Sequence, residues 1–246
     1  MISTLEKEIT FRFLKARKND GFLNVISIFS FIGISLGVAV LIIVMSVMNG
    51  FRTELINKIV GFNSHITVQP YEQAIKINDV KKGSLELISK NLILSNSSEA
   101  IIIKEKSSKG ILLRGYLEDD FSKLELINNK NFVGETKNLE KNFISIGKEL
   151  SFTLDLKIGD NISIMSSSGV ETIIGNLPKQ KTFTVISIFD SGLADFDNNI
   201  IFLNLETLEE FSNLSKDDRN LEVYLKNPQK IENQKNIVKK IFPMDL

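Results

Sequence analysis

The longest uninterrupted run of apolar positions lies near the start of the chain, from Val25 to Met48. Its 24 residues include no charged side chain and no proline. At about 1.5 Å of rise per helical residue, such a run is long enough to cross the ~30 Å hydrocarbon layer of a bilayer. We therefore predict a transmembrane helix over residues 25–48.

Two other kinds of segment could give an apolar run at this position. A secretory signal peptide has an apolar stretch of only ~7 to 15 residues and ends in a cleavage site with small side chains. The segment after the run, Asn49–Arg52, does not resemble such a site. A core helix of a soluble protein would show a polar stripe, and this run has none. The pattern favours a membrane helix over both.

Basic side chains are unequally distributed on the two sides of this run. Five precede it, whereas two fall in the twenty residues after it: Lys7, Arg12, Lys15, Arg17 and Lys18 before, Arg52 and Lys58 after. Because the more basic flank stays in the cytoplasm, the amino terminus is predicted to be cytoplasmic and the main domain to lie on the opposite side of the membrane.

The segment before the membrane run, residues 1–24, carries its own pattern. Leu5, Ile9 and Phe13 recur every fourth residue with basic groups between them. This spacing is typical of an amphipathic helix that lies in the headgroup layer. A merely solvated, positively charged anchor is the alternative interpretation.

Within the membrane run, Gly33 and Gly37 form a GxxxG pattern. Small side chains allow a second helix to approach closely, and in lipid such packing must replace the hydrophobic effect between helices. We predict that Gly33 and Gly37 pack against another membrane helix. Because glycine is common in transmembrane helices, a purely structural role stays open.

After the membrane run, the patterns become shorter and suggest a stalk followed by an α+β domain. Residues 49–64 read as a helical stalk, with Leu55, Ile59 and Phe62 on one stripe. Eight segments have strand patterns: 65–69, 100–104, 111–116, 143–146, 162–165, 183–189, 200–203 and 221–225. Four have helix patterns: 80–90, 148–154, 205–211 and 228–242. Strands in series with segregated helices predict an α+β periplasmic domain with a mixed sheet over residues 65–246.

The connection between the strands at Ile162 and Phe183 is unusually long. Connections beyond ~12 to 15 residues are usually functional or disordered. This one, at about residues 166–181, contains regularly placed apolar and turn-forming residues: Val170, Ile173, Ile174 and Leu177, with Gly169, Gly175 and Pro178. We predict a protruding β-hairpin arm. Its apolar side chains either fold back on the domain or await a partner.

Composition narrows the chemistry further. Thirty acidic and thirty basic residues balance, so nothing in the net charge indicates nucleic acid as a partner. The chain has no cysteine, one histidine, His65, and no GxxxxGK[ST] phosphate loop. These features argue against thiolate or histidine metal sites, a Ser-His-Asp triad and nucleotide binding by a P-loop. We predict no catalytic residue, no metal and no cofactor.

Three segments resemble a known family. They are FRFLKAR at residues 11–17, FSFIGISLGV at 29–38 and MSVMNGF at 45–51. This series is similar to the start of LolC and LolE, the permease subunits of the lipoprotein-releasing ABC transporter of Gram-negative bacteria. The resemblance continues through GKEL at 147–150, GD at 159–160 and LPKQKTFTV at 177–185, so it covers nearly the whole chain.

The resemblance implies a mechanical role rather than catalysis. In that family a protruding hairpin called the hook grips the periplasmic lipoprotein carrier LolA. The implied hook residues here are Val170, Ile173, Ile174, Leu177 and Pro178, and the implied contact patch at the base is Lys179, Gln180 and Lys181. The implied partners are a LolD-like ATPase subunit, a second LolC/LolE-type permease, a LolA-like carrier, lipoprotein substrates and membrane lipid.

The chain departs from the family pattern in three respects. The arm is slightly shorter, and Ser163 stands where a basic residue is expected, so docking of a carrier is expected to be weaker or differently distributed. The family also has three further transmembrane helices after the periplasmic domain. No such run follows here, so we expect a partial chain.

Several alternatives stay open. The hook favours LolC over LolE, but the sequence does not separate LolC, LolE and a single fused-type permease. A MacB-like or FtsX-like mechanotransmission permease would share the helix and the domain without needing a carrier. A membrane-anchored periplasmic enzyme would need a pocket with convergent titratable groups, and the sequence offers no such set.

Overall fold

A computed structural model describes residues 3–14, 21–70, 74–75, 83–104, 107–124, 126–127, 132–135, 139–172 and 175–242. Isoleucines 173 and 174, assigned to the arm tip from the sequence, lie outside the described residues. The chain divides into two compact units, Met1–Ile56 and Asn57–Leu246.

The first unit is helical. Helix α1 spans Thr4–Leu14, and helix α2 begins at Gly21 and continues without a break to Phe62, into the second unit. The stretch Val25–Glu54 of α2 has a mean hydropathy of 2.8, and none of its most apolar window is buried. It is the one helix among the described residues that is long and apolar enough to cross a membrane. Side chains such as Phe29 are 70% exposed within the chain, as expected where lipid is the solvent.

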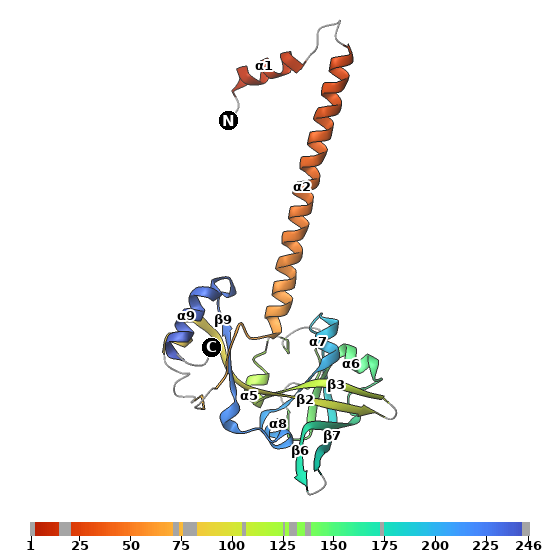
Figure 1. Cartoon of the computed structure of the whole chain (residues 1–246), viewed down its shortest axis with the longest axis vertical. Coiled ribbons are helices and arrows are strands. Elements are labelled where there is room, and N and C mark those ends of the chain that lie inside the picture. Colours follow the sequence, from red (N-terminus) through yellow and green to blue (C-terminus); the bar gives the residue numbers. More distant parts are fainter. Residues whose placement is uncertain are drawn as a thin grey trace. The chain divides into compact units, whose positions relative to one another are not determined.

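The second unit is a mixed α+β domain built on a nine-stranded sheet, counted over the described residues (Figure 1). The strands are β1 (Ile66–Val68), β2 (Ser89–Lys104), β3 (Ser107–Tyr116), β4 (Val133–Gly134), β5 (Phe143–Gly147), β6 (Asn161–Thr172), β7 (Gly175–Phe189), β8 (Ile200–Asn204) and β9 (Asn220–Leu225). The α-helices are α4 (Gly83–Ile88), α5 (Glu118–Phe121), α6 (Lys148–Thr153), α7 (Ala194–Asn199), α8 (Leu205–Ser212) and α9 (Ile231–Ile241); two 3₁₀ turns are η1 (Lys216–Asp218) and η2 (Pro228–Lys230).

Six of the strands close into a ring. Pairing runs from β2 to β3, β8, β5, β7 and β6, and then from β6 back to β2. The β3–β8 and β5–β7 pairs are parallel and the other four are antiparallel. Because side chains alternate along each strand, one set of apolar residues from each strand points into the ring. The result is a small closed barrel.

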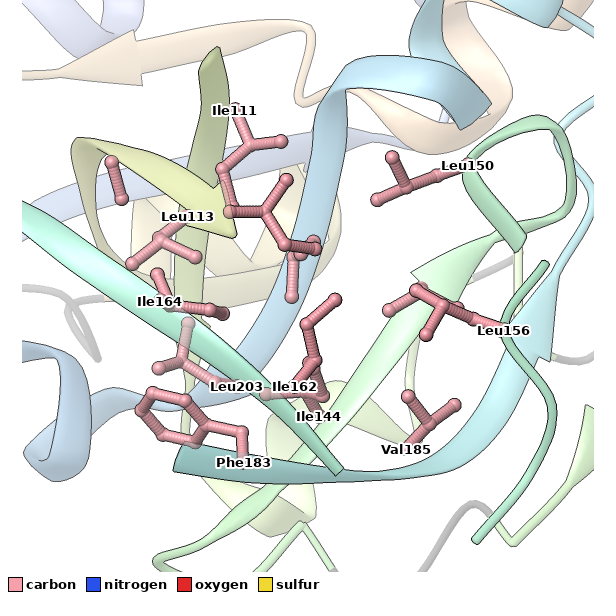
Figure 2. Packing of buried hydrophobic residues seen from close by; sticks show 14 of the residues in the cluster. Ile111, Leu113, Ile144, Leu150, Leu156, Ile162, Ile164, Phe183, Val185 and Leu203 are labelled. Atoms are coloured by element: carbon pink, nitrogen blue, oxygen red, sulfur yellow. The ribbon is translucent and has the colours of Figure 1, made fainter. Parts of the chain in front are cut away.

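The barrel core is filled mainly by aliphatic side chains, together with the rings of Phe183 and Phe211 (Figure 2 labels Phe183). Ile144, Ile164 and Leu203 are fully buried, and Phe183 packs edge-on against Phe211 of α8, with ring centroids 5.7 Å apart. Leu208 of α8 and Leu150 of α6 add further apolar surface to the same core. Helices α6 and α8 are therefore held in place by this core.

The rest of the sheet continues beyond the barrel. Strand β9 pairs with the first half of β2, and β1 pairs with β9. A separate apolar cluster joins these strands to α4 and α9 through Val68, Leu85, Val223 and Val238. The helix pattern predicted over residues 80–90 is wrong at its end, because β2 begins at Ser89 and pairs with β9 there.

Candidate partner-binding arm and buried polar clusters

The arm is the far end of the β6–β7 hairpin. In this antiparallel hairpin, Asn161 pairs with Thr184 at the base, and Thr172 pairs with Gly175 at the outer end. Met165 pairs with Gln180, and Gly169 pairs with Pro178. Four positions along β6 therefore match only two along β7, so β6 carries two extra residues there. Such an irregularity bends the strand and increases its local twist. The sequence predicted the hairpin but not this bulge.

Successive residues of β7 point to opposite faces of the arm, which separates the predicted contact residues. Pro178 and Gln180 lie on the exposed outer face. Leu177 belongs to the other face, which continues into the barrel core, yet 52% of its surface is exposed. Leu177 lies directly opposite Val170 on β6. An exposed leucine on a projecting hairpin is available to a partner.

The two lysines of the predicted patch have different surroundings from Gln180. Lys179 Nζ donates to Asn213 Oδ1 and to the carbonyl oxygen of Glu210, the latter at 2.9 Å. Lys181 Nζ lies 5.4 Å from the ring centroid of Phe183. Both lysines are half-buried, whereas Gln180 is exposed. The patch is therefore divided between two faces of the strand, with Gln180 the member on the outer face.

The two glycines of the membrane helix are open to their surroundings. A methyl group added at Gly33 or at Gly37 would meet no atom within 4 Å. This leaves room for a neighbouring helix on that face of α2.

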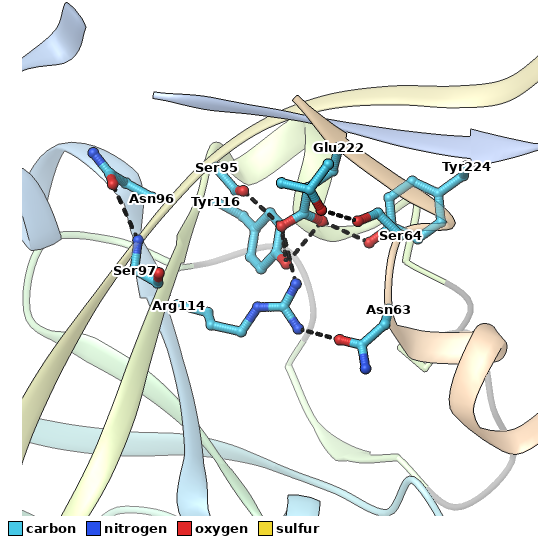
Figure 3. A network of polar contacts seen from close by, with 10 residues as sticks. Asn63, Ser64, Ser95, Asn96, Ser97, Arg114, Tyr116, Glu222 and Tyr224 are labelled. Carbon is cyan, nitrogen blue, oxygen red and sulfur yellow. Dashed lines mark hydrogen bonds and ion pairs between the residues drawn. The ribbon is translucent and has the colours of Figure 1, made fainter. Parts of the chain in front are cut away.

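A buried polar cluster centres on Glu222 of β9, which the sequence did not single out (Figure 3). Its carboxylate accepts hydrogen bonds from Ser95 Oγ at 2.6 Å, from Tyr224 Oη at 2.8 Å and from Tyr116 Oη at 3.1 Å. It also forms an ion pair of 2.9 Å with Arg114. The carboxylate is thus paired and hydrogen-bonded, which offsets the cost of burying its charge.

The same cluster reaches the segment that follows α2. The second guanidinium nitrogen of Arg114 donates to Asn63 Oδ1 at 2.9 Å. Burial by itself lowers the pKa of Arg114, but Tyr116 and the charge of Glu222 raise it above its ordinary value. Burial raises the pKa of Tyr116 and of Tyr224, so both phenols stay protonated and donate. These contacts connect β2, β3 and β9 to the residue that follows α2, so the cluster has a structural role.

A second cluster joins α6 to α7. Lys148 Nζ donates to Asp190 at 3.0 Å, and the carboxylate of Asp197 accepts from the backbone N–H of Ser191 at 3.0 Å. Burial raises the pKa of Asp197, and the neighbouring charge of Asp190 adds to this. Burial also opposes ionisation of Asp190, but the hydrogen bond from Lys148 lowers the pKa of Asp190 below its ordinary value.

The remaining features give no catalytic set. Among the residues that the structure describes, no group of three or more acidic or histidine side chains could hold a metal ion. A cavity of about 540 Å³ lies between α4, α5, β2 and β9. Its Lys123 is paired with Asp120 at 2.6 Å, and its Lys226 donates to the carbonyl of Glu86 at 2.8 Å. Both lysines are already engaged in contacts within the domain.

A protein-family model described as the MacB-like periplasmic core domain matches residues 27–241. Among solved structures, the periplasmic region of MacB from Actinobacillus actinomycetemcomitans is similar at a TM-score of 0.44 and 11% identity, covering 75% of this chain and 87% of that one. The extracellular domain of the noncanonic ABC-type transporter YknZ from Gram-positive bacteria has a TM-score of 0.41 and 12% identity, covering 69% and 88%.

Curated relatives are more similar in sequence. The lipoprotein-releasing system transmembrane protein LolC of Buchnera aphidicola subsp. Acyrthosiphon pisum is 31% identical, covering 95% of this chain and 58% of its own length. LolC of Xylella fastidiosa (strain Temecula1) is 28% identical, covering 85% of this chain and 52% of its own length. LolE of Haemophilus influenzae is 28% identical over 65% of this chain and 40% of its own length. The chain spans about half the length of the LolC relatives it matches.

One long apolar helix joined to a mixed α+β domain is the arrangement of a membrane-anchored domain protein. The chain belongs to the family with a MacB-like periplasmic core domain, and the curated relatives that it matches are LolC and LolE proteins. The resemblance drawn from the sequence is therefore confirmed, as is the α+β fold class. The carrier-binding residues and the domain boundaries predicted from the sequence stay predictions.

Proposed function

We propose that this chain belongs to the permease subunit of an ABC transporter that releases lipoproteins from the inner membrane to a periplasmic carrier. The arm contacts the carrier, a LolD-like ATPase hydrolyses ATP on the cytoplasmic side, and a second LolC/LolE-type permease packs near Gly33 and Gly37. The amino terminus is cytoplasmic and the α+β domain is periplasmic. The chain supplies no catalytic group and needs no cofactor.

One observation carries this proposal beyond family membership: a hairpin that projects past the barrel and exposes apolar residues. Leu177 is half exposed, and Pro178 is exposed on the opposite face of the same strand. A protein that only transmits movement across the membrane has no need of such an arm. A carrier that shields lipid chains has an apolar, concave surface, for which an apolar projection is a suitable partner.

The test is calorimetric titration of the whole chain, held in lipid nanodiscs, with the lipoprotein carrier of the same organism. Leu177→Asp places a charge in the proposed contact and should weaken binding about tenfold or more. The control is Phe152→Asp on α6, where the wild-type ring is 86% exposed but lies outside the arm. This variant should bind as the wild type does.

The outcomes separate two candidate functions. Loss of binding with Leu177→Asp alone supports carrier docking by the arm. Equal weakening by both variants would point to an unspecific apolar contact. If the folded wild-type chain does not bind the carrier at all, a carrier-independent permease that transmits mechanical movement becomes the better proposal, as the MacB-like family allows.

A further inference from the structure

The outer part of the arm has no third strand beside it among the described residues. Strand β2 pairs with β6 only as far as Ser166, and β5 pairs with β7 only from Thr184 onward. The pairs from Gly169–Pro178 to Thr172–Gly175 therefore form a two-stranded ribbon. Isolated two-stranded ribbons are only marginally stable in water. The direction of the arm thus depends on what holds its base.

On the β6 side, the base is tied to the end of helix α8. Ser168 Oγ donates to the carbonyl oxygen of Ser212 at 2.6 Å. Asn213 Nδ2 donates to the carbonyl oxygen of Gly169 at 3.1 Å. Ser168 lies in the bulge of β6, and its backbone N–H is held by Ser166 Oγ at 3.2 Å. The two extra residues therefore bring β6 to the helix end.

On the β7 side, Lys179 makes the corresponding connection. Its ammonium group donates to the carbonyl oxygen of Glu210 and to Asn213 Oδ1. The last carbonyl groups of a helix lack intrahelical partners and carry partial negative charge, so a lysine is favoured there. Asn213 has a left-handed backbone with φ of 54°, typical of the residue that ends a helix. Its amide thus bridges both strands of the arm.

Helix α8 is itself fixed in the domain. Leu208 and Phe211 are buried in the barrel core. Glu209 forms a bidentate ion pair with Arg219, whose Nε and Nη2 donate to the two carboxylate oxygens at 2.6 and 2.7 Å. The side chain of Asn204 caps the first turn of α8. The arm is therefore connected to a rigid support rather than to a mobile loop.

We propose that Ser168, Lys179 and Asn213 form a clasp that fixes the direction of the arm before a partner arrives, so that Lys179 is a positioning residue and not a contact residue. The binding consequence rests on the proposed carrier function, whereas the effect on arm direction does not. A ribbon held in one direction loses less conformational freedom on binding than a free one. Under this proposal Lys179, which the sequence assigns to the contact patch, positions the arm instead.

The variants follow from the geometry. Asn213→Gly removes both side-chain bonds, while glycine accepts the left-handed backbone without strain. Lys179→Met removes the ammonium group, and Lys179→Arg restores a donor and should rescue. Lys216→Met is the matched control, because Lys216 pairs at 3.5 Å with Glu206 in the first turn of α8 and does not contact the arm.

The direct readout is a spin-label distance distribution. The natural chain has no cysteine, so Thr172→Cys on the arm and Lys235→Cys on α9 provide a defined label pair in the whole chain. A narrow distribution is expected for the labelled parent, the control and Lys179→Arg. Asn213→Gly and Lys179→Met should give broad distributions. Narrow, unchanged distributions in both of these variants would overturn the clasp.

Carrier titration then separates this proposal from the proposed function. If the clasped direction falls to roughly a tenth to a fifth of the population, the apparent affinity falls about 5- to 10-fold. Broadened distances with weakened binding support both proposals. Broadened distances in a chain whose parent never binds the carrier support the clasp and reject the carrier. Weakened binding with unchanged distances rejects the clasp and makes Lys179 a contact residue.

Discussion

At the scale of single residues, close packing explains why the GKEL segment at residues 147–150, one of those by which the chain resembles its family, begins with glycine. Gly147 ends β5 and precedes α6, where a side chain would overlap the backbone carbonyl of Asp197. The glycine is required because two backbones approach each other, with φ in the ordinary negative range. Lys148 then reaches Asp190, so one position of this segment packs against α7 and the next pairs with the segment that leads into α7.

Gly147→Ala is expected to destabilise the domain by about 2–3 kcal/mol, since a methyl group would have to push the α7 backbone away. Chemical denaturation of the chain measures this. Gly110→Ala is the matched control, because a methyl group there meets nothing within 4 Å, and its effect should stay within about 0.5 kcal/mol. Equal stability of the two variants would contradict the overlap.

Asp197 gives a pH dependence with a defined sign. Burial raises its pKa above the ordinary value of 3.8, so the folded state binds this proton more tightly than the unfolded state. The contribution to stability is therefore fully present at pH below 3.8 and is lost as the pH rises through the pKa of the folded state. Asp190 acts in the opposite direction, because its pKa is lowered.

Asp197→Asn removes this loss, and an amide oxygen can still accept from the N–H of Ser191. The unfolding free energy of the variant minus that of the wild type should therefore increase as the pH rises from about 3 to 7. Urea denaturation across that range provides the measurement, with Asp195→Asn, exposed on the same helix, as the control. A decrease in this difference with rising pH would reject the raised pKa of Asp197.

At the scale of elements, the cluster around Glu222 joins strands that are far apart in sequence. Ser95 comes from β2, Arg114 and Tyr116 from β3, and Glu222 and Tyr224 from β9. Removing Arg114 leaves the buried charge of Glu222 without its cation, which is far more costly than removing an exposed pair.

Arg114→Met is expected to lower the unfolding free energy by about 3–5 kcal/mol. The double variant Arg114→Met with Glu222→Gln should recover part of this, because the unpaired charge is gone. Lys216→Met, from an ion pair whose side chains are 70% and 55% exposed, should cost less than about 1 kcal/mol. If the single and double variants are equally unstable, the ion pair is not the origin of the effect.

These elements also show how far sequence reasoning reached. The strands at 143–146, 200–203 and 221–225 were predicted because apolar runs bounded by turns mark buried strands. Residues 89–99 of β2 were missed because serines and asparagines interrupt the apolar pattern there, although four consecutive residues, Ile93 to Asn96, are buried. The short helices α5 and α7 were missed as well, since one or two turns carry too little periodicity.

At the scale of the whole molecule, the α+β class and the hairpin could be predicted, but the closed barrel could not. Closure depends on Ser163–Ser166 of β6 pairing with Ala100–Ile103 of β2, about sixty positions earlier in the chain. Nothing local in either segment indicates that partner. The same holds for Lys179, whose sequence neighbours suggest a basic patch while its actual partners, Glu210 and Asn213, belong to another element.

Closure of the barrel also bears on aggregation. A ring of paired strands presents no open edge on which a second chain could add a strand. Outside the arm, the strands at the two ends of the sheet are short: β1 has three residues and β4 has two. On the arm, Pro178 lacks the N–H that edge-to-edge pairing would need. The domain can therefore be displayed at high local density on a membrane surface with little tendency to form intermolecular sheets.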